Sequence, residues 1–228
     1  MGCDVHFYVE RLMDGRWETA DTWVPRRSGG LEVETSRQFY SARDYDLFAI
    51  LADVRNRHDF TPIAAPRGVP DDCCEEYRRE VALWENNGHS HSWLTLDEML
   101  RFDWTQLCLE HGWVTPWGWF RWLHDGAPDG SLSWIAEGSA SRHSNAEFQQ
   151  ALDVLGRERR YPDLRAPSSD YERFVELLGG SNPVTYIEWL VPYHDKVSQF
   201  WSATVPRLLA LSRSQTFDDV RVLFFFDN

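Results

Sequence analysis

Hydrophobic and polar residues alternate at the start of the chain with the period of a β-strand. Over residues 3–9 the odd positions are apolar, while the even positions carry polar or aromatic side chains that include Asp4 and His6. Asp14-Gly15 is typical of a tight hairpin turn, and residues 16–24 supply a returning strand. The chain is therefore expected to open with a half-buried β-hairpin.

Several later segments repeat apolar residues every three to four positions, which is the period of a helix with one buried face. Some of these segments are preceded by a Ser or Thr, and a Glu stands three residues after that Ser or Thr. This is the spacing of a capping box. We predict helices over residues 47–56, after Asp71 or Asp72, after Thr95/Glu98, after Ser144/Glu147, over 171–178 and over 197–208 with a kink at Pro206.

The end of the chain contains two apolar runs separated by a helical pattern. Val184–Val191 is rich in β-branched and aromatic residues, and Val220–Phe226 is almost entirely apolar, as in a strand covered on both faces. A strand, a helix and a strand in this order predict a crossover between parallel strands. We therefore predict an α+β fold with a mixed β-sheet, built from the N-terminal hairpin and a C-terminal strand-helix-strand unit, and several packed helices. The length fits a single domain over residues 1–228.

Composition narrows the classes of partner. The formal net charge of −13 repels phosphate backbones and anionic lipids at long range, so we expect neither duplex nucleic acid nor a membrane as a partner. No apolar run approaches the roughly 20 residues of a membrane span, and no export signal opens the chain, so a cytoplasmic location is expected. Of the 23 basic residues only Lys196 is a lysine. Arginine is preferred where a planar fork grips an anion, so a local anion site remains compatible with an acidic chain.

Tryptophan is unusually abundant, with 12 residues in the chain. The segment of residues 104–134 is the richest in them, and its Gly, Pro and Asp residues interrupt any regular period, so we predict irregular structure there. Two interpretations remain open for the rings. They either fill the core and the gaps between loops, which we favour because large aromatics dominate buried area, or they form a stacking surface for a base or a sugar ring.

Side chains able to bind metals or transfer protons gather near both chain ends. If the first and last strands pair antiparallel, Asp227 arrives beside Asp4, and His6 lies about 6.6 Å further along the same strand face. His89 and His91 lie in a short polar segment between two predicted helices. In an extended loop, residues two apart point to one side, so both imidazoles are expected to face the same ion.

These residue types predict a metal centre without thiolate ligands, for a divalent zinc, manganese or iron ion. The expected metal ligands are His6, His89, His91 and Asp227. Catalytic roles are expected for Asp4, for His6 and for Arg67, whose turn Pro66-Arg67-Gly68 suits the binding of an anion. The alternative is that each of these side chains only caps a turn or satisfies backbone groups, and that Arg67 is an ordinary surface arginine.

Five stretches of the sequence resemble a family of uncharacterised bacteriophage and actinobacterial proteins that open with Met-Gly-Cys-Asp-(Ile/Val)-His and end in Phe-Asp-Asn. Here the matching stretches are Met1–His6, Tyr45–Ala49, Pro66–Gly68, His91–Thr95 and Phe226–Asn228. The resemblance spans the chain from end to end. It implies a phage or actinobacterial setting, and the host cytoplasm if the protein is phage-encoded, rather than a mechanism.

Two functions fit these features. The first is a small metal-dependent hydrolase of a phosphate ester or nucleotide, in which a metal-bound water attacks and Arg67 stabilises charge on the leaving phosphate. The alternative is a non-catalytic phage accessory protein that binds a host protein or sequesters a small nucleotide signal through the Trp-rich segment. The expected partner is therefore a small anionic ligand or a host protein. We favour the hydrolase because the histidine-containing segments are rich in ligand-type side chains.

Overall fold

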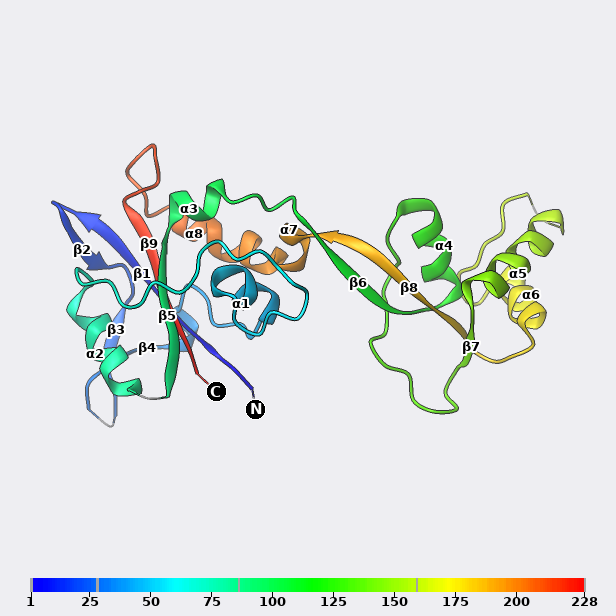
Figure 1. Ribbon diagram of the computed structural model, residues 1–228, viewed down its shortest axis with the longest axis horizontal. Coiled ribbons are helices and arrows are strands. Elements are labelled where there is room, and N and C mark those ends of the chain that lie inside the picture. Colours follow the sequence, from blue (N-terminus) through cyan, green and yellow to red (C-terminus); the bar gives the residue numbers. More distant parts are fainter. Residues whose placement is uncertain (1, 28, 86, 159, 228) are drawn as a thin grey trace. The chain divides into compact units, whose positions relative to one another are not determined.

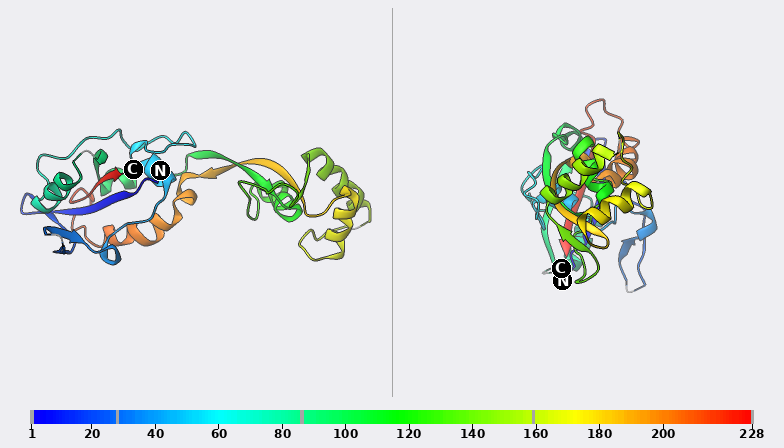
Figure 2. Two further views of the ribbon diagram at one scale, coloured as in Figure 1. Left: turned by 90° about the horizontal axis from the view of Figure 1, so that it is seen from below. Right: turned by 90° about the vertical axis from the view of Figure 1, so that its right-hand side faces the viewer.

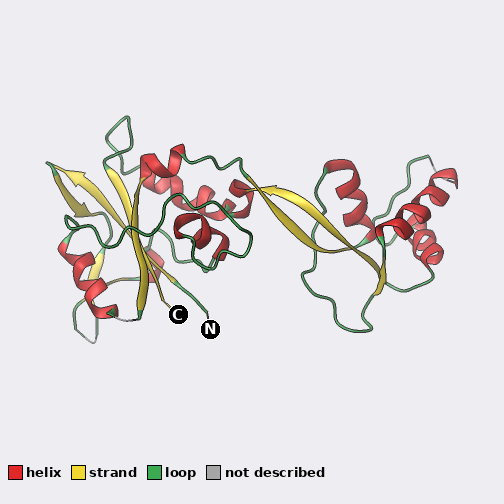
Figure 3. Cartoon of the chain, in the orientation of Figure 1, coloured by secondary structure: helices red, strands yellow, loops and turns green. Residues whose placement is uncertain are grey.

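The computed structural model describes residues 2–27, 29–85, 87–158 and 160–227 (Figure 1). Contacts between Cα atoms divide the chain into two compact units: unit 1 comprises residues 1–106 and 192–228, and unit 2 comprises residues 107–191. The fold is α+β, as predicted, and each unit contains a β-sheet and several helices (Figure 3). The length of the chain suggested a single domain. The structure has two compact units instead, because the inserted residues of unit 2 bury a hydrophobic core of their own.

The predicted hairpin forms one edge of the sheet in unit 1, whose strand order is β2-β1-β9-β5. β1 (Val5–Met13) pairs antiparallel with β2 (Arg16–Thr19) across the turn. The two turn residues, Asp14 and Gly15, have φ angles of 49° and 79°. Positive φ at both positions is typical of a type I′ turn, for which Asp-Gly is a favoured pair because it tolerates this conformation.

β9 (Val220–Asp227) lies inside this sheet, antiparallel to β1 on one side and to β5 (Gly88–Thr95) on the other. Phe225 packs on one face with α2 (Glu75–Trp84), and Phe226 packs on the other face, 5.0 Å from the ring of Phe48. Because both faces are covered, nearly every position of the strand is apolar. The antiparallel pairing also places the two ends of the chain side by side (Figure 2).

The predicted parallel crossover at the end of the chain is wrong. β8 (Pro183–Pro192) belongs to the sheet of unit 2, in the order β6-β8-β7, whereas β9 belongs to unit 1. Parallel pairing occurs instead between β8 and β7 (Ser141–His143). A local hydrophobic pattern identifies a strand but not its partner, so it could not show that the chain passes from unit 2 to unit 1 after β8.

Several helices of unit 1 lie close to their predicted positions. α1 (Tyr45–Ala52) begins after Asp44, whose side chain accepts hydrogen bonds from two backbone N–H groups of the first turn. α3 (Leu96–Arg101) has the predicted capping box of Thr95 and Glu98. α2 begins after Cys74 rather than after Asp71 or Asp72.

The long helix predicted over residues 197–208 is replaced by three short segments. These are α7 (Tyr193–Lys196), the π-helical η2 (Phe200–Thr204) and α8 (Val205–Leu209). Pro206, which has no N–H, is the second residue of α8, directly after the π-helical segment. The remaining elements of unit 1 are β3 (Trp23–Pro25), β4 (Leu31–Val33) and the 3-10 helix η1 (Thr35–Arg37).

Unit 2 packs α4 (Pro116–Asp125), α5 (Asn145–Glu158) and α6 (Ser169–Leu178) around an aromatic core. The ring of Phe148 makes edge contacts with those of Trp119 and Phe174, at centroid distances of 5.4 and 5.3 Å. No described helix in either unit is long and apolar enough to cross a membrane.

The Trp-rich segment is largely regular, contrary to prediction. It contains β6 (Leu107–Val114) and α4, which begins at Pro116, and aromatic residues around the whole helix hide its period. The core interpretation holds for only part of the segment. Trp104 and Trp119 are 7% and 1% exposed, whereas Trp134 is 73% exposed.

Candidate functional site

The start of β1 and the end of β9 bring Asp4, His6 and Asp227 together, and β5 adds His91; we call these four residues the terminal cluster. The Asp4 N–H donates to Oδ1 of Asp227 over 2.9 Å, and the Asp227 N–H donates to the Asp4 carbonyl over 3.1 Å. The other oxygen of Asp227, Oδ2, lies 3.2 Å from Nε2 of His6. The predicted meeting of the chain ends is therefore confirmed; Met1 and Asn228 lie outside the described residues.

The His6 ring is packed between aromatic side chains. Phe225 stacks on it with a centroid distance of 4.4 Å and an interplanar angle of 6°, and Trp84 lies 4.2 Å away at a tilt. The side chains of His6 and Asp227 are 19% and 21% exposed. Because its faces are occupied, the imidazole offers mainly its Nε2 edge, which faces the Asp227 carboxylate. This arrangement suits proton exchange at Nε2 better than stacking with a ligand.

His89 and His91 do not point to the same side, contrary to prediction. Both lie in β5 rather than in a loop, and the register with β9 shifts between His89 and Ser92. The φ angle of Ser90 is 51°, so the strand contains a β-bulge that reverses the usual alternation. His91 therefore contacts Phe225 at 4.9 Å, while His89 faces the neighbouring Phe226 at 6.1 Å on the other side of the sheet.

The cluster has some, but not all, properties of a metal site. Burial lowers the pKa of His91, and the nearby His89 and His6 lower it further, so the neutral form that binds metals is favoured. The Nδ1 atom of His91 is buried without a hydrogen-bond partner in the described chain. Across the four described ranges, however, no three His, Cys, Asp or Glu side chains are arranged to hold a metal ion. The metal ligands inferred from the sequence thus stay a prediction.

The other two predicted catalytic side chains are held in ion pairs. Arg43 binds the Asp4 carboxylate through Nε and Nη2, over 2.7 and 2.6 Å, and these hydrogen bonds lower the pKa of Asp4. Arg67 binds Glu98 in the same two-pronged way, over 3.0 and 2.6 Å, and lies 4.8 Å above the ring of Trp93. Trp93 is near the end of β5 that lies away from the terminal cluster, so Arg67 stabilises the start of α3 rather than facing the cluster.

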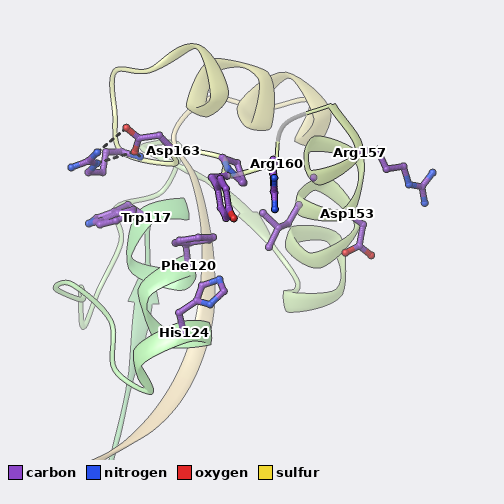
Figure 4. A pocket seen from close by; sticks show the side chains of 12 residues that line it. Trp117, Phe120, His124, Asp153, Arg157, Arg160 and Asp163 are labelled. Carbon is purple, nitrogen blue, oxygen red and sulfur yellow. Dashed lines mark hydrogen bonds and ion pairs between the residues drawn. The ribbon is translucent and has the colours of Figure 1, made fainter.

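Unit 2 contains a cavity on its own surface, which we call the aromatic cavity. It has a volume of about 950 Å³, is open to solvent, and is lined by α4, α5 and the loop that follows α5 (Figure 4). The side chains of Trp117, Phe120 and His124 recur along one face of α4. Their rings follow one another, with centroid distances of 5.9 Å from Trp117 to Phe120 and 4.4 Å from Phe120 to His124. This stripe gives the cavity one aromatic wall.

Arginines are also among the residues that line the aromatic cavity. Arg160 extends over the cavity, whereas Arg157 of α5 extends away from it (Figure 4). The guanidinium carbon of Arg160 lies 5.4 Å from the ring of Tyr161. Arg165 is bound to Asp163 by two hydrogen bonds of 2.9 and 3.0 Å and lies 5.4 Å from the ring of Trp117. The cavity therefore combines ring surfaces with guanidinium groups, which is the chemistry needed to bind a flat, negatively charged molecule.

Sequence reasoning named the Trp-rich segment as a candidate surface but missed this cavity. The signal was present as aromatic residues at positions 117, 120 and 124, spaced by three and four, yet core-facing Trp119 lies among them. The arginines of residues 157–165 gave no sign that they meet this face. Comparisons with protein-family models, curated proteins and solved structures give no match.

Proposed function

We propose that unit 2 binds a small molecule that joins a planar ring to an anionic group, and that this molecule is a nucleotide. The observation that carries the proposal is the aromatic cavity itself, with rings along one wall and arginines among its lining residues. Its volume of about 950 Å³ is at the upper end of the range for small-molecule sites. The proposal corresponds to the second of the two functions considered above, capture of a small nucleotide without catalysis.

The aromatic wall supplies the attraction for a base. Phe120 and Trp117 present nearly parallel rings, with an interplanar angle of 20°. A base that stacks on one such ring gains about 1–3 kcal/mol, largely irrespective of its identity. We therefore expect rings to set the affinity for the base, and expect only modest discrimination between purines and pyrimidines from this wall.

The guanidinium groups supply the attraction for a phosphate. Arg160 lies over the same cavity, with its guanidinium carbon 5.4 Å from the ring of Tyr161, so it can supply the charge that a phosphate needs. Arginine binds phosphate through two parallel hydrogen bonds, which favours a nucleotide over the corresponding uncharged nucleoside.

The glycine of α5 provides a test that leaves the fold intact. A Cβ atom added to Gly156 meets no heavy atom within 4 Å, and this residue lines the cavity. Gly156→Leu therefore fills the cavity from a helix position where replacement of glycine stabilises the helix by about 0.5–1 kcal/mol. Isothermal titration calorimetry with mononucleotides is expected to show binding to the wild type and at least a tenfold loss in Gly156→Leu.

Two further variants separate the contribution of cavity volume from that of charge. Gly156→Ala makes the same helix change with little loss of volume, so it is expected to bind almost as the wild type does. Arg160→Ala is expected to weaken the nucleotide but not the nucleoside. If Gly156→Leu binds as tightly as Gly156→Ala, or if no mononucleotide binds the wild type, the proposed function is wrong.

The hydrolase remains a second candidate because Asp4, His6, His91 and Asp227 converge at one end of the sheet in unit 1. It predicts that the protein takes up a divalent zinc, manganese or iron ion. It also predicts that His91→Ala abolishes this uptake while His89→Ala, on the opposite face, does not. Metal analysis after dialysis against each ion tests both statements, and a protein that retains no ion removes this candidate.

A further inference from the structure

A second cavity, in unit 1, has four arginine and lysine side chains among its ten lining residues, and we call it the cationic cavity. It has a volume of about 480 Å³ and lies at the N-terminal end of α1, beside residues 53–60 and the end of α7. The arginine, lysine and aspartate residues that line it are Arg43, Asp44, Asp46, Arg55, Arg57 and Lys196. Four of these are cations and two are carboxylates. Arg43 is in addition bound by the Asp4 carboxylate, so the local formal charge is +1 when Asp4 is counted, in a chain of −13.

The two carboxylates of the cationic cavity are engaged with donors of the protein. Asp44 caps α1, and its Oδ1 accepts hydrogen bonds from the N–H groups of Asp46 and Leu47, both over 3.1 Å. Asp46 binds Lys196 over 3.0 Å. A bound anion would therefore meet carboxylates whose charge is already partly compensated, next to guanidinium groups that carry several donors each.

Lys196 is the only lysine of the sequence, and it lies in this cavity. Its side chain is only 19% exposed. An ammonium group is a compact charge with three donors that can turn toward different acceptors, whereas a guanidinium is a rigid plane. One of these donors reaches Asp46 over 3.0 Å. A chain that uses arginine at every other basic position thus has its one compact cation at this cavity.

The loop that carries Arg55 has strained backbone conformations. Asp53, Arg55 and Asp59 have φ angles of 59°, 57° and 52°. Left-handed backbone costs energy for residues other than glycine, and such strain persists where the surrounding structure imposes it, often at binding sites. Asn56 fixes the loop, because its side chain donates to the Phe60 carbonyl over 2.8 Å and accepts from the Phe60 N–H over 2.9 Å. Arg55 is therefore held in a defined place at the cavity.

We propose that the cationic cavity binds a small oxyanion of the phosphate type, with Arg55, Arg57 and Lys196 as the binding residues. Arg57 contributes from the rim, where its guanidinium lies 6.0 Å from the ring of Tyr45. The cavity is too polar to attract a ring, in contrast to the aromatic cavity of unit 2. Its ligand is thus inorganic phosphate, pyrophosphate or the phosphate group of a small metabolite. The site is distinct from the proposed nucleotide site and does not depend on it.

The test measures pyrophosphate binding by calorimetry at constant ionic strength, with chloride as the replacing anion. Arg55→Gly removes the charge and relieves the positive φ, so this variant is expected to fold at least as well as the wild type. Arg57→Ala removes a charge at the rim. Each substitution is expected to weaken pyrophosphate binding about tenfold, and Lys196→Gln to weaken it similarly.

The matched control is Arg101→Ala, which removes one positive charge from an exposed ion pair elsewhere in unit 1. It is expected to leave pyrophosphate affinity unchanged. If it weakens binding as much as Arg55→Gly does, the effect is one of net charge and the site is refuted. The proposed site is also refuted if the wild type does not bind pyrophosphate at a concentration of about 1 mM. Circular dichroism of each variant shows whether the fold is retained, and Arg57→Ala, at the rim, keeps the test decisive if another variant unfolds.

Discussion

The buried carboxyl group of Asp21 should make the stability of unit 1 depend on pH. Asp21 is 9% exposed, and its Oδ2 accepts the Val9 N–H over 2.7 Å while its Oδ1 has no hydrogen-bond partner in the described chain. Burial raises its pKa from 3.8 to about 7; the Val9 N–H and Arg207 oppose this rise, and Glu10 adds to it. The folded state therefore holds a proton that the unfolded chain releases near pH 4.

The sign follows from the two pKa values. Between pH 4 and 7 the folded state binds more protons than the unfolded state, so the free energy of unfolding falls as pH rises. Each pH unit in this window costs at most about 1.4 kcal/mol, which amounts to about 4 kcal/mol over the whole shift. Asp21→Asn keeps an acceptor for the Val9 N–H but cannot ionise. Its stability advantage over the wild type should therefore widen by up to about 3 kcal/mol between pH 5 and pH 7.

Native-state hydrogen exchange of the Val9 amide is the appropriate assay, because it reports on unit 1 even if the two units unfold separately. The difference in opening free energy between Asp21→Asn and the wild type is measured at pH 5, 6 and 7. A difference that stays constant would show that the Asp21 carboxyl does not change its protonation on folding, and the argument from burial would then be wrong.

Three further sets of substitutions test the aromatic packing, a buried ion pair and a helix cap. Trp119→Ala is expected to cost about 3–5 kcal/mol in thermal or denaturant unfolding because the ring is 1% exposed, whereas Trp134→Ala, at 73% exposed, should change stability by less than about 0.5 kcal/mol. Arg221→Met should cost about 3–5 kcal/mol because it leaves the Glu10 carboxylate buried without its partner 2.6 Å away, and adding Glu10→Gln should recover part of this loss. Thr95→Ala removes the capping box of α3 and should cost about 1 kcal/mol in chemical denaturation.

The parts of the fold that follow from local chemistry were predictable. The alternation of β1 and the Asp14-Gly15 turn fix the hairpin, and the capping boxes at Thr95 and Ser144 locate two helix starts. The antiparallel meeting of the chain ends was an assumption about topology that the structure confirms, because the patterns of the two strands do not by themselves specify that they pair. Strand partners across the two units did not follow, since a pattern within β8 does not encode whether it pairs with β7 or with β9.

The candidate site residues also divide into those placed by a local strand pattern and those placed by contacts between distant segments. Asp4, His6 and Asp227 were correctly placed together, because regular strands carry side chains to known faces. The pair His89 and His91 was misplaced because the bulge at Ser90 arises from pairing with β9, and no local pattern marks it. The aromatic cavity was missed for a related reason, since its rings and arginines come from segments about 40 residues apart in the chain.

The two proposed ligand sites raise the question of how an acidic chain attracts an anion. The charge of −13 acts over the whole surface, but at physiological ionic strength its field decays within about 8 Å. A duplex nucleic acid is much longer than this screening length, so it is repelled by the net charge of the whole surface. A mononucleotide or pyrophosphate is small enough to interact mainly with the arginines that line its cavity. The dependence of affinity on salt distinguishes the two effects. Local pairing predicts weaker binding as salt rises, because salt screens the attraction, whereas control by the net charge predicts tighter binding, because salt screens the repulsion.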